Sequence, residues 1–373
     1  MLQEAPEGKR LPAILKRISK IVLAALAHAS GLTGPLLRRL LRSKSSAIVL
    51  GYHGVCREAG GLFDSGHAVA NVSALLRYLS RHLRPLPLEA LAGPVARGEA
   101  PPPASFAVTF DDGLVNNVTL AIPMLKALGL PATFFVPSGL VGSPRDLWVA
   151  SLREVIRTWP GDFLPPEPGL WPALPLQGEG TRYTALHRIK KVLKAHEGRR
   201  EEVLARLCRK SGVISPLPEE DRVVGPELLP ELVQPGLSVG AHSRSHPILS
   251  GLDPERAREE IAGSRQDLER LLGTKVRDFA YPNGGFADFN ETTRRLVAEA
   301  GFRCALTTEP GTVRAGDDAL ALRRCMPENV PAFLASFDLL IRAWKDRRRP
   351  ADGTLPLERR VSFLGRVAAE AGV

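Results

Sequence analysis

Cysteine is scarce in this chain, and long apolar runs are absent. Only 4 of the 373 residues are cysteine, with neither the paired spacing of a zinc knuckle nor the density of a secreted disulfide scaffold. No stretch reaches the ~20 consecutive apolar residues that a membrane-spanning helix needs. We therefore expect a reducing compartment and no transmembrane span. The 44% of hydrophobic residues is ordinary for a globular protein and sufficient for a large core.

The body of the chain also lacks an excess of positive charge, although the net charge is +10. Positions 1–50 carry nine basic and two acidic residues, and positions 341–373 carry eight basic and four acidic residues. The basicity thus belongs to the two ends, and we expect no nucleic-acid-binding groove in the main domain. Segment 343–373 is rich in Arg, with Pro and Gly interruptions, and is predicted to be a surface tail.

Segment 1–45 is predicted to form basic amphipathic helices. A second short helix is expected from Pro35 to Leu41. Such helices either pack on the protein or lie on an anionic membrane surface. The short apolar run before residue 29 also has the look of a cleaved signal peptide. We expect a cytoplasmic protein in peripheral contact with the inner membrane through residues 11–42, with packing on the body and export as alternatives. The apolar residues that recur at helical spacing are Ile14, Ile18, Ile21, Val22 and Leu26.

Strand-like and helical segments alternate between residues 46 and 342. Such alternation predicts an α/β fold with a parallel sheet, and in a chain of this size an open or closed (β/α) barrel. Segment 143–225 interrupts the pattern with Pro and Gly clusters around two basic amphipathic helices, and is predicted to be a helical cap inserted into the barrel. The predicted strands are 47–53, 106–110, 132–136, 237–242, 276–282, 304–308 and 319–325, and the predicted helices outside the insertion are 72–83, 121–129, 254–273 and 290–301.

Two adjacent carboxylates, Asp111 and Asp112, follow the predicted strand 106–110. Ligand sites in barrels lie beyond the carboxyl ends of the strands, so this position favours catalysis. His242 and His246 follow another strand and are one helical turn apart. A carboxylate and two imidazoles make a three-ligand set for a divalent metal, with zinc expected and cobalt, nickel or iron also suitable. The remaining aspartate could act as a base, but the pattern does not distinguish the two.

The motifs TFDDG, HSRSH and FAYPNGG together resemble those of the polysaccharide deacetylases, the nodulation-deacetylase-like domain of carbohydrate esterase family four. GYHGV and LKALGLPATFFV also resemble its biofilm-polysaccharide branch. The resemblance covers roughly residues 48–330. It implies a deformed (β/α) barrel of about seven parallel strands, a divalent metal, and hydrolysis of an N-acyl, usually N-acetyl, group. The substrate would be an amino sugar in a polysaccharide, oligosaccharide or lipid-linked saccharide.

By this resemblance Asp111 is the base, and Asp112, His242 and His246 are the metal ligands. The third motif of the family commonly begins with an arginine that orients the base, and Ala280 stands in its place here. Arg323 and Arg324, on the last predicted strand, are candidates to steady Asp111 instead, although we expect at least one of them to point outward.

The late leucine-x-histidine motif that usually supplies the general acid is also absent, because no histidine follows His246. His53, at the end of the predicted strand 47–53, is the expected replacement, as the equivalent motif of the biofilm branch suggests. The alternative is a buried histidine bonded to backbone. These departures motivate a second hypothesis for the whole chain, a catalytically silent saccharide-binding protein on the same fold.

The predicted substrate groove combines backbone and side-chain contacts. Its glycines would let the backbone approach the sugar closely, and a backbone N–H near Asn283 would stabilise an oxyanion. Asn116 and Asn117 would bind sugar hydroxyls, unless they only start a turn or helix. The tryptophans of the cap are expected to form a small core of their own, with one indole lining a sugar cleft as the alternative. The predicted substrate-binding residues are Tyr281, Pro282, Asn283, Gly284, Asn116 and Arg324, and the cap tryptophans are Trp148, Trp159 and Trp171.

Overall fold

The computed structural model describes residues 19–58, 61, 63, 66–212 and 217–347. Its centre is a parallel sheet in the strand order β1-β5-β6-β9-β10-β11-β12, and the short strand β4 (Arg84–Pro85) extends along β5. A parallel bridge from Leu50 to Cys325 joins β1 to β12 and nearly closes the barrel. The seven strands are β1 (Ile48–Tyr52), β5 (Ser105–Phe110), β6 (Ala132–Val136), β9 (Leu237–Ala241), β10 (Asp278–Ala280), β11 (Cys304–Pro310) and β12 (Leu322–Arg324).

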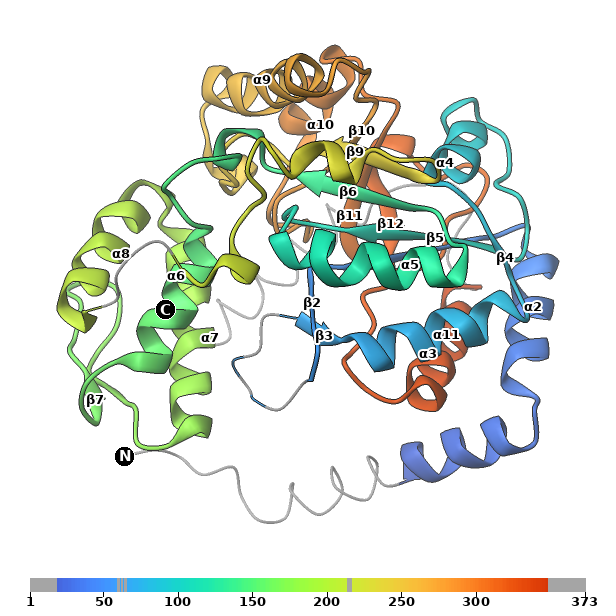
Figure 1. The fold of residues 1–373 in the computed structure, drawn as a ribbon, viewed down its shortest axis with the longest axis horizontal. Helices are drawn as coiled ribbons and strands as arrows, with labels where there is room; N and C mark the ends of the chain where they lie inside the picture. The colour runs from blue at the N-terminus through green and yellow to red at the C-terminus, as the bar shows by residue number, and fades with distance from the viewer. Residues whose placement is uncertain (1–18, 59–60, 62, 64–65, 213–216, 348–373) are drawn as a thin grey trace, which may run out of the picture.

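Each of these strands lies within or against a segment that the sequence predicts, so the deformed (β/α) barrel of seven parallel strands is confirmed. Strands β1, β5 and β6 are buried along their whole length, as expected for a parallel sheet covered by helices on its faces. Helices surround the sheet in Figure 1. They are α3 (Val69–Ser80), α4 (Leu88–Ala96), α5 (Ile122–Leu128), α9 (Pro254–Leu272), α10 (Glu291–Glu299) and α11 (Ala332–Asp346).

Local signals explain the helix boundaries where the prediction succeeds. The Asp253 carboxylate caps α9 by accepting a hydrogen bond from the Arg256 N–H at 3.0 Å, and Pro254 occupies the first turn. Gly273 ends the same helix with φ +65°, a conformation that glycine adopts at little cost. The chain also forms short helical turns: η1 (Asn117–Ala121), η2 (Ser138–Leu140), η3 (Glu219–Asp221), η4 (Leu229–Leu232), η5 (Leu249–Gly251) and η6 (Ala319–Ala321).

Several parts of the fold outside the insertion were not predicted, among them helix α4. A separate pair of short strands, β2 (Gly54–Cys56) and β3 (Gly66–Ala68), follows β1. Helix α11 continues to Asp346 and so crosses the predicted boundary at residue 342. Its buried side chains include Leu339 and Ala343, and the helix packs against α3 and α2 (Thr33–Ser43). The remainder of the predicted tail, from residue 348, lies outside the described residues.

The insertion forms a cap with its own hydrophobic core. It contains α6 (Trp148–Thr158), α7 (Glu179–Ala195), α8 (Glu197–Ser211) and the hairpin β7–β8 (Phe163–Leu164, Leu174–Pro175). Trp148, Trp159 and Trp171 are all buried in that core. The expected tryptophan core is therefore confirmed, and the alternative that one indole lines a sugar cleft is wrong.

The described N-terminal residues form two helices, Ser19–Ala29 and α2. Leu37 and Leu41 of α2 are buried, and Lys20 pairs with Asp338 of α11 at 2.7 Å. Among the described residues no single helix is long and apolar enough to cross a membrane; the two N-terminal helices pass that test only as a pair, bent by 90°. In Figure 1 they lie on the side of the barrel away from the cap. Residues 1–18 of the predicted amphipathic segment lie outside the described residues.

Candidate active site

The two adjacent aspartates occupy different environments because the chain turns sharply between them. Asp111 continues the strand, and its N–H donates to the Tyr52 carbonyl at 2.8 Å. Asp112 has φ 73°, in the left-handed region that non-glycine residues rarely adopt. Gly113 follows at φ 56°, where an added Cβ would lie 2.8 Å from the Val136 side chain. As a result Asp111 is buried while Asp112 lines a pocket.

Asp112, His242 and His246 converge on one point. A ligand atom from each lies within 4.8 Å of the others. The Asp112 Oδ1 atom is 3.6 Å from Nε2 of His242 and 3.4 Å from Nε2 of His246, and it has no hydrogen-bond partner in the structure. Donors bonded to one zinc ion at ~2.0–2.2 Å in tetrahedral geometry lie about 3.4 Å apart. These three side chains therefore fit a shared divalent cation.

The supporting contacts leave both Nε2 atoms free to bind a cation. The Nδ1 atom of His242 lies 2.7 Å from the Ala280 carbonyl oxygen, which fixes the tautomer as a second-shell partner does in metal sites. The loop between the histidines is held by Glu260, whose carboxylate accepts hydrogen bonds from the N–H groups of Arg244 and Ser245, each at 2.8 Å. Burial lowers the pKa of His246 to about 3, so its imidazole is neutral, as a ligand must be.

Asp111 forms a buried ion pair with Arg324 of β12. Nη1 of Arg324 donates to Oδ1 at 2.7 Å and Nη2 donates to Oδ2 at 2.6 Å. Burial alone would raise the pKa of the Asp111 carboxyl, but Arg324 and then His242 outweigh it and hold that pKa below its usual value. Asp111 is therefore ionised, and an arginine takes the place of the one missing at Ala280. The neighbouring Arg323 lies beside Phe286, with its guanidinium 5.5 Å from the ring centre.

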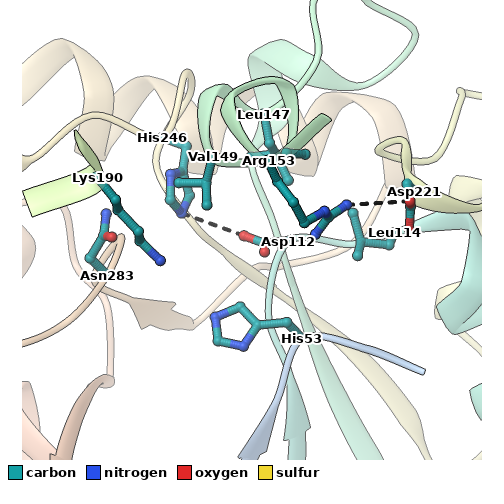
Figure 2. Close-up of a pocket in the computed structure, with 11 residues that line it drawn as sticks. His53, Asp112, Leu114, Leu147, Val149, Arg153, Lys190, Asp221, His246 and Asn283 are labelled. Atoms are coloured by element: carbon teal, nitrogen blue, oxygen red, sulfur yellow. Dashed lines mark hydrogen bonds and ion pairs between the residues drawn. The ribbon is translucent and has the colours of Figure 1, made fainter. Parts of the chain in front are cut away.

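A pocket of about 230 Å³ is lined by Asp112 and His246, two of the three converging side chains (Figure 2). The barrel contributes His53, Asp112, His246 and Asn283 to its lining, and helices α6 and α7 of the cap contribute Arg153 and Lys190. His53 lines the pocket and is exposed, so the alternative of a buried histidine bonded to backbone is wrong. The lining residues are His53, Asp112, Leu114, Leu147, Val149, Ala150, Arg153, Lys190, Asp221, His246 and Asn283.

Several predicted substrate contacts do not reach this pocket. Tyr281 is fully buried, stacks on Phe289 with ring centres 4.3 Å apart, and donates its hydroxyl to the Leu320 carbonyl. Pro282 and Gly284 are buried too, and neither lines the pocket. Gly284, at φ +70°, permits a tight turn in which a Cβ would lie 2.8 Å from the Thr308 nitrogen. Of the predicted groove wall only Asn283 faces the pocket.

Asn116 and Arg324 were also wrongly predicted to bind substrate. The Asn116 amide is occupied by protein, because Oδ1 accepts from the Val55 N–H at 3.1 Å and Nδ2 donates to the Glu220 carbonyl at 2.8 Å. Asn117 has the same structural character, since its Oδ1 accepts from the Leu114 N–H at 3.2 Å. Arg324 is fully buried, and its N–H groups donate to the Asp111 carboxylate and to the Thr307 carbonyl.

The cap residues of the pocket were missed altogether. Lys190 belongs to one of the two basic amphipathic helices predicted in the insertion, whereas Arg153 lies on α6, which was not predicted. Neither residue stands out from the other Lys and Arg residues of the insertion. Their only signal in the sequence is helical spacing. That spacing does not distinguish a helix face that lines a pocket from one that faces water.

The chain is similar to proteins of one family. Residues 98–305 match the family described as polysaccharide deacetylase. A 98-residue stretch is 30% identical to YxkH of Bacillus subtilis (strain 168), covering 26% of this chain and about a third (34%) of YxkH.

Three solved structures show the same fold. The Streptococcus pyogenes deacetylase PplD in complex with acetate is 17% identical, with 80% of this chain and 99% of PplD covered at a TM-score of 0.51. IcaB from Ammonifex degensii is 21% identical, with 80% of this chain and 97% of IcaB covered at a TM-score of 0.51. BC0361, a polysaccharide deacetylase from Bacillus cereus, is 17% identical, with 80% of this chain and 69% of BC0361 covered at a TM-score of 0.51. At these identities the likeness concerns the fold. Since the family match spans more than half of the chain, the chain belongs to the polysaccharide deacetylase family.

Proposed function

We propose that this protein is a metal-dependent hydrolase that removes an N-acyl group, usually acetyl, from an amino sugar. One observation carries the proposal: Asp112, His242 and His246 converge at a pocket, with the ionised Asp111 directly before Asp112 in the chain. Zinc is the expected cation, and the same nitrogen and oxygen donors suit cobalt, nickel or iron. A cation held there would lower the pKa of water toward ~7 and polarise an acyl carbonyl.

The chain supplies the proton transfers. Arg324 keeps Asp111 ionised and fixes its orientation, so that Asp111 can accept a proton from the attacking water. An amine leaves poorly as an anion, so a donor is needed before the C–N bond breaks. His53 is the candidate, because its imidazole lines the pocket and the Asn117 amide holds its backbone carbonyl at 3.0 Å. The products are a free amine on the sugar and a carboxylate, acetate in the usual case.

The size of the pocket supports a substrate that enters by one sugar unit. Its volume of about 230 Å³ is below the ~300–1,000 Å³ of most pockets that enclose a drug-sized ligand. Leu114, Leu147 and Ala150 add apolar surface to a lining that also carries polar and charged side chains. We therefore propose a terminal sugar of a saccharide, or a short saccharide, as substrate.

We further propose peripheral binding to an anionic membrane through residues 19–43. Large apolar side chains are exposed there next to three exposed arginines, a combination typical of interfacial helices. Because these helices lie away from the cap, the contact would anchor the protein rather than line the pocket. No disulfide joins the four cysteines in the part of the chain that the structure describes, which supports our placing the protein in a reducing compartment, hence on the cytoplasmic surface. The residues involved are Ile21, Val22, Leu23, Leu26, Leu32 and Leu36, with Arg38, Arg39 and Arg42.

Acetate release tests the main proposal. Zinc-loaded protein should release acetate and free amine from N-acetylglucosamine oligosaccharides, a chelator should stop the release, and zinc or cobalt should restore it. Asp111→Asn should abolish turnover while the metal stays bound. Saccharide binding by calorimetry without acetate release under any metal would instead support the catalytically silent binding protein.

A further inference from the structure

Lys190 is a cation at the pocket without a partner. It projects from α7 of the cap and is partly buried. Within the described part of the chain it makes neither an ion pair nor a hydrogen bond. Burial and then the nearby Lys194 lower its pKa, although Asp112 and Asp288 act in the opposite sense. An ammonium group withdrawn from water loses hydration that only another polar group can replace.

The other cations around the pocket are already neutralised. Arg153 pairs with Asp221 at 3.3 Å, and Arg324 pairs with Asp111 at 2.6 Å. Lys194, one turn along α7, pairs with Asp288 at 3.5 Å. Lys190 therefore differs from its neighbours in having its charge directed at the pocket itself.

A second unpartnered donor lines the same pocket. The Nδ2 atom of Asn283 is buried and has no hydrogen-bond partner in the structure. The turn that presents it is fixed, since Asn283 has φ 61° and its carbonyl accepts from the Thr308 hydroxyl at 2.7 Å. In the view of Figure 2, Lys190 and Asn283 line the same side of the pocket, across from Arg153 and Asp221. Two unpartnered donors in one pocket, one of them charged, match a group that only accepts hydrogen bonds.

We propose that Lys190 and Asn283 bind an anionic group, a phosphate or a carboxylate, that the substrate saccharide carries near its acylated amine. This inference rests on the proposed function and defines its substrate class as acidic amino sugars. Oxygens of such groups accept several hydrogen bonds and are bound more strongly by charged than by neutral donors. A neutral hydroxyl could accept a hydrogen bond from Lys190 but would bring no opposite charge to it.

Three soluble probes that share one acetylated sugar test the proposal. They are N-acetylglucosamine 1-phosphate, N-acetylmuramic acid, which carries a carboxylate, and the neutral methyl glycoside of N-acetylglucosamine. For the zinc-loaded protein we expect kcat/KM to be at least about 10-fold higher for one acidic probe than for the neutral one. Lys190→Met should reduce that preference about 10- to 100-fold, as the loss of a charged hydrogen bond does. The matched control is Lys191→Met, which removes an exposed charge at the next position of α7 and should keep the preference.

The outcomes separate this inference from the proposed function. Equal kcat/KM for all three probes would overturn the anion site. A preference for acidic probes that survives in Lys190→Met would also overturn it and would assign the preference to another cation. Which acidic probe is preferred distinguishes phosphate from carboxylate. If neither the probes nor N-acetylglucosamine oligosaccharides release acetate, the proposed function fails, and calorimetry on the zinc-loaded protein still decides the binding question. Tighter binding of the acidic probes, lost in Lys190→Met, would support the site, and equal binding would refute it.

Discussion

Arg324 on β12 holds both carboxylate oxygens of Asp111 at the end of β5, at 2.7 and 2.6 Å. The guanidinium is itself fixed, because Nε donates to the Thr307 carbonyl at 2.7 Å and Nη1 lies 3.2 Å from the Thr109 hydroxyl. Both partners are buried. Asp111, the base that we propose, is thus held in one orientation before any substrate arrives, which favours efficient proton transfer.

We expect Arg324→Met to lower the free energy of unfolding by about 3–5 kcal/mol, because it leaves a buried carboxylate without its partner. Activity should fall as well, since Asp111 would lose its orientation and its ionised form. Chemical denaturation in urea and acetate release measure the two effects. Arg323→Met, at the next position of the same strand, should cost less than about 1 kcal/mol. The double variant Arg324→Met/Asp111→Asn should recover part of the lost stability but no activity. A double variant as unstable as Arg324→Met would contradict the ion-pair explanation.

The same pair predicts a pH dependence of stability. The folded protein holds the pKa of Asp111 below its unfolded value of about 3.9. The ion pair therefore contributes fully to the stability of the folded protein at pH values above the unfolded pKa. That contribution is lost as the pH falls through the depressed pKa of the folded protein. In Arg324→Met burial raises the pKa of Asp111 instead. The stability difference between wild type and variant should be largest at pH 7–8 and shrink toward pH 4, measured by urea unfolding at each pH. A constant difference would mean that Asp111 is not the group affected.

The sequence predicts the barrel well because each strand is a short apolar run, and burial on both faces requires little else. It also predicts that Asp112, His242 and His246 lie close together, since both motifs follow strands and the strand ends meet at one edge of the barrel. Polar residues next to those motifs were harder to interpret. Asn116 and Tyr281 sit beside catalytic motifs, yet their polar atoms bond to distant backbone groups at Glu220 and Leu320. Such partners have no local signature in the sequence.

The three-ligand set predicts how metal content responds to mutation. Wild-type protein should bind one divalent ion per chain, measured by elemental analysis after dialysis. Asp112→Ala, His242→Ala and His246→Ala should each lose most of that metal, because each removes one of three ligands. His53→Ala is the control within the same pocket and should retain a full equivalent. Undiminished metal in His246→Ala would place the ion elsewhere.

His53 should matter for turnover and not for metal. His53→Gln keeps a polar side chain but removes the proton donor, so kcat should fall about 10²- to 10⁴-fold with the metal content unchanged. Because His53 does not hold the cation in this arrangement, KM should change little. His67, which lies near His53 but bonds to the Pro327 carbonyl at 2.8 Å, offers a comparison: His67→Gln should leave kcat within a few-fold of wild type. Full activity in His53→Gln would assign the proton donor to another group.

The exposed apolar residues of the N-terminal helices predict membrane binding. Leu23, Leu26 and Leu32 are 57%, 63% and 55% exposed, so replacing all three by serine removes apolar surface without opening the core. We expect the triple variant to bind anionic phosphatidylglycerol vesicles about 10- to 100-fold more weakly than wild type, because each leucine contributes buried apolar area at the interface.

Co-sedimentation with vesicles measures this difference, and the variant should keep its activity on soluble substrate because these residues are far from the pocket. Leu271→Ser removes another exposed leucine, 43% exposed on α9, and should bind vesicles like wild type. Neutral phosphatidylcholine vesicles should bind both proteins weakly, since Arg38, Arg39 and Arg42 find no anionic partner there. If the triple variant sediments with anionic vesicles as well as wild type does, the N-terminal helices are not the membrane contact, and their apolar surface must be covered by something other than lipid.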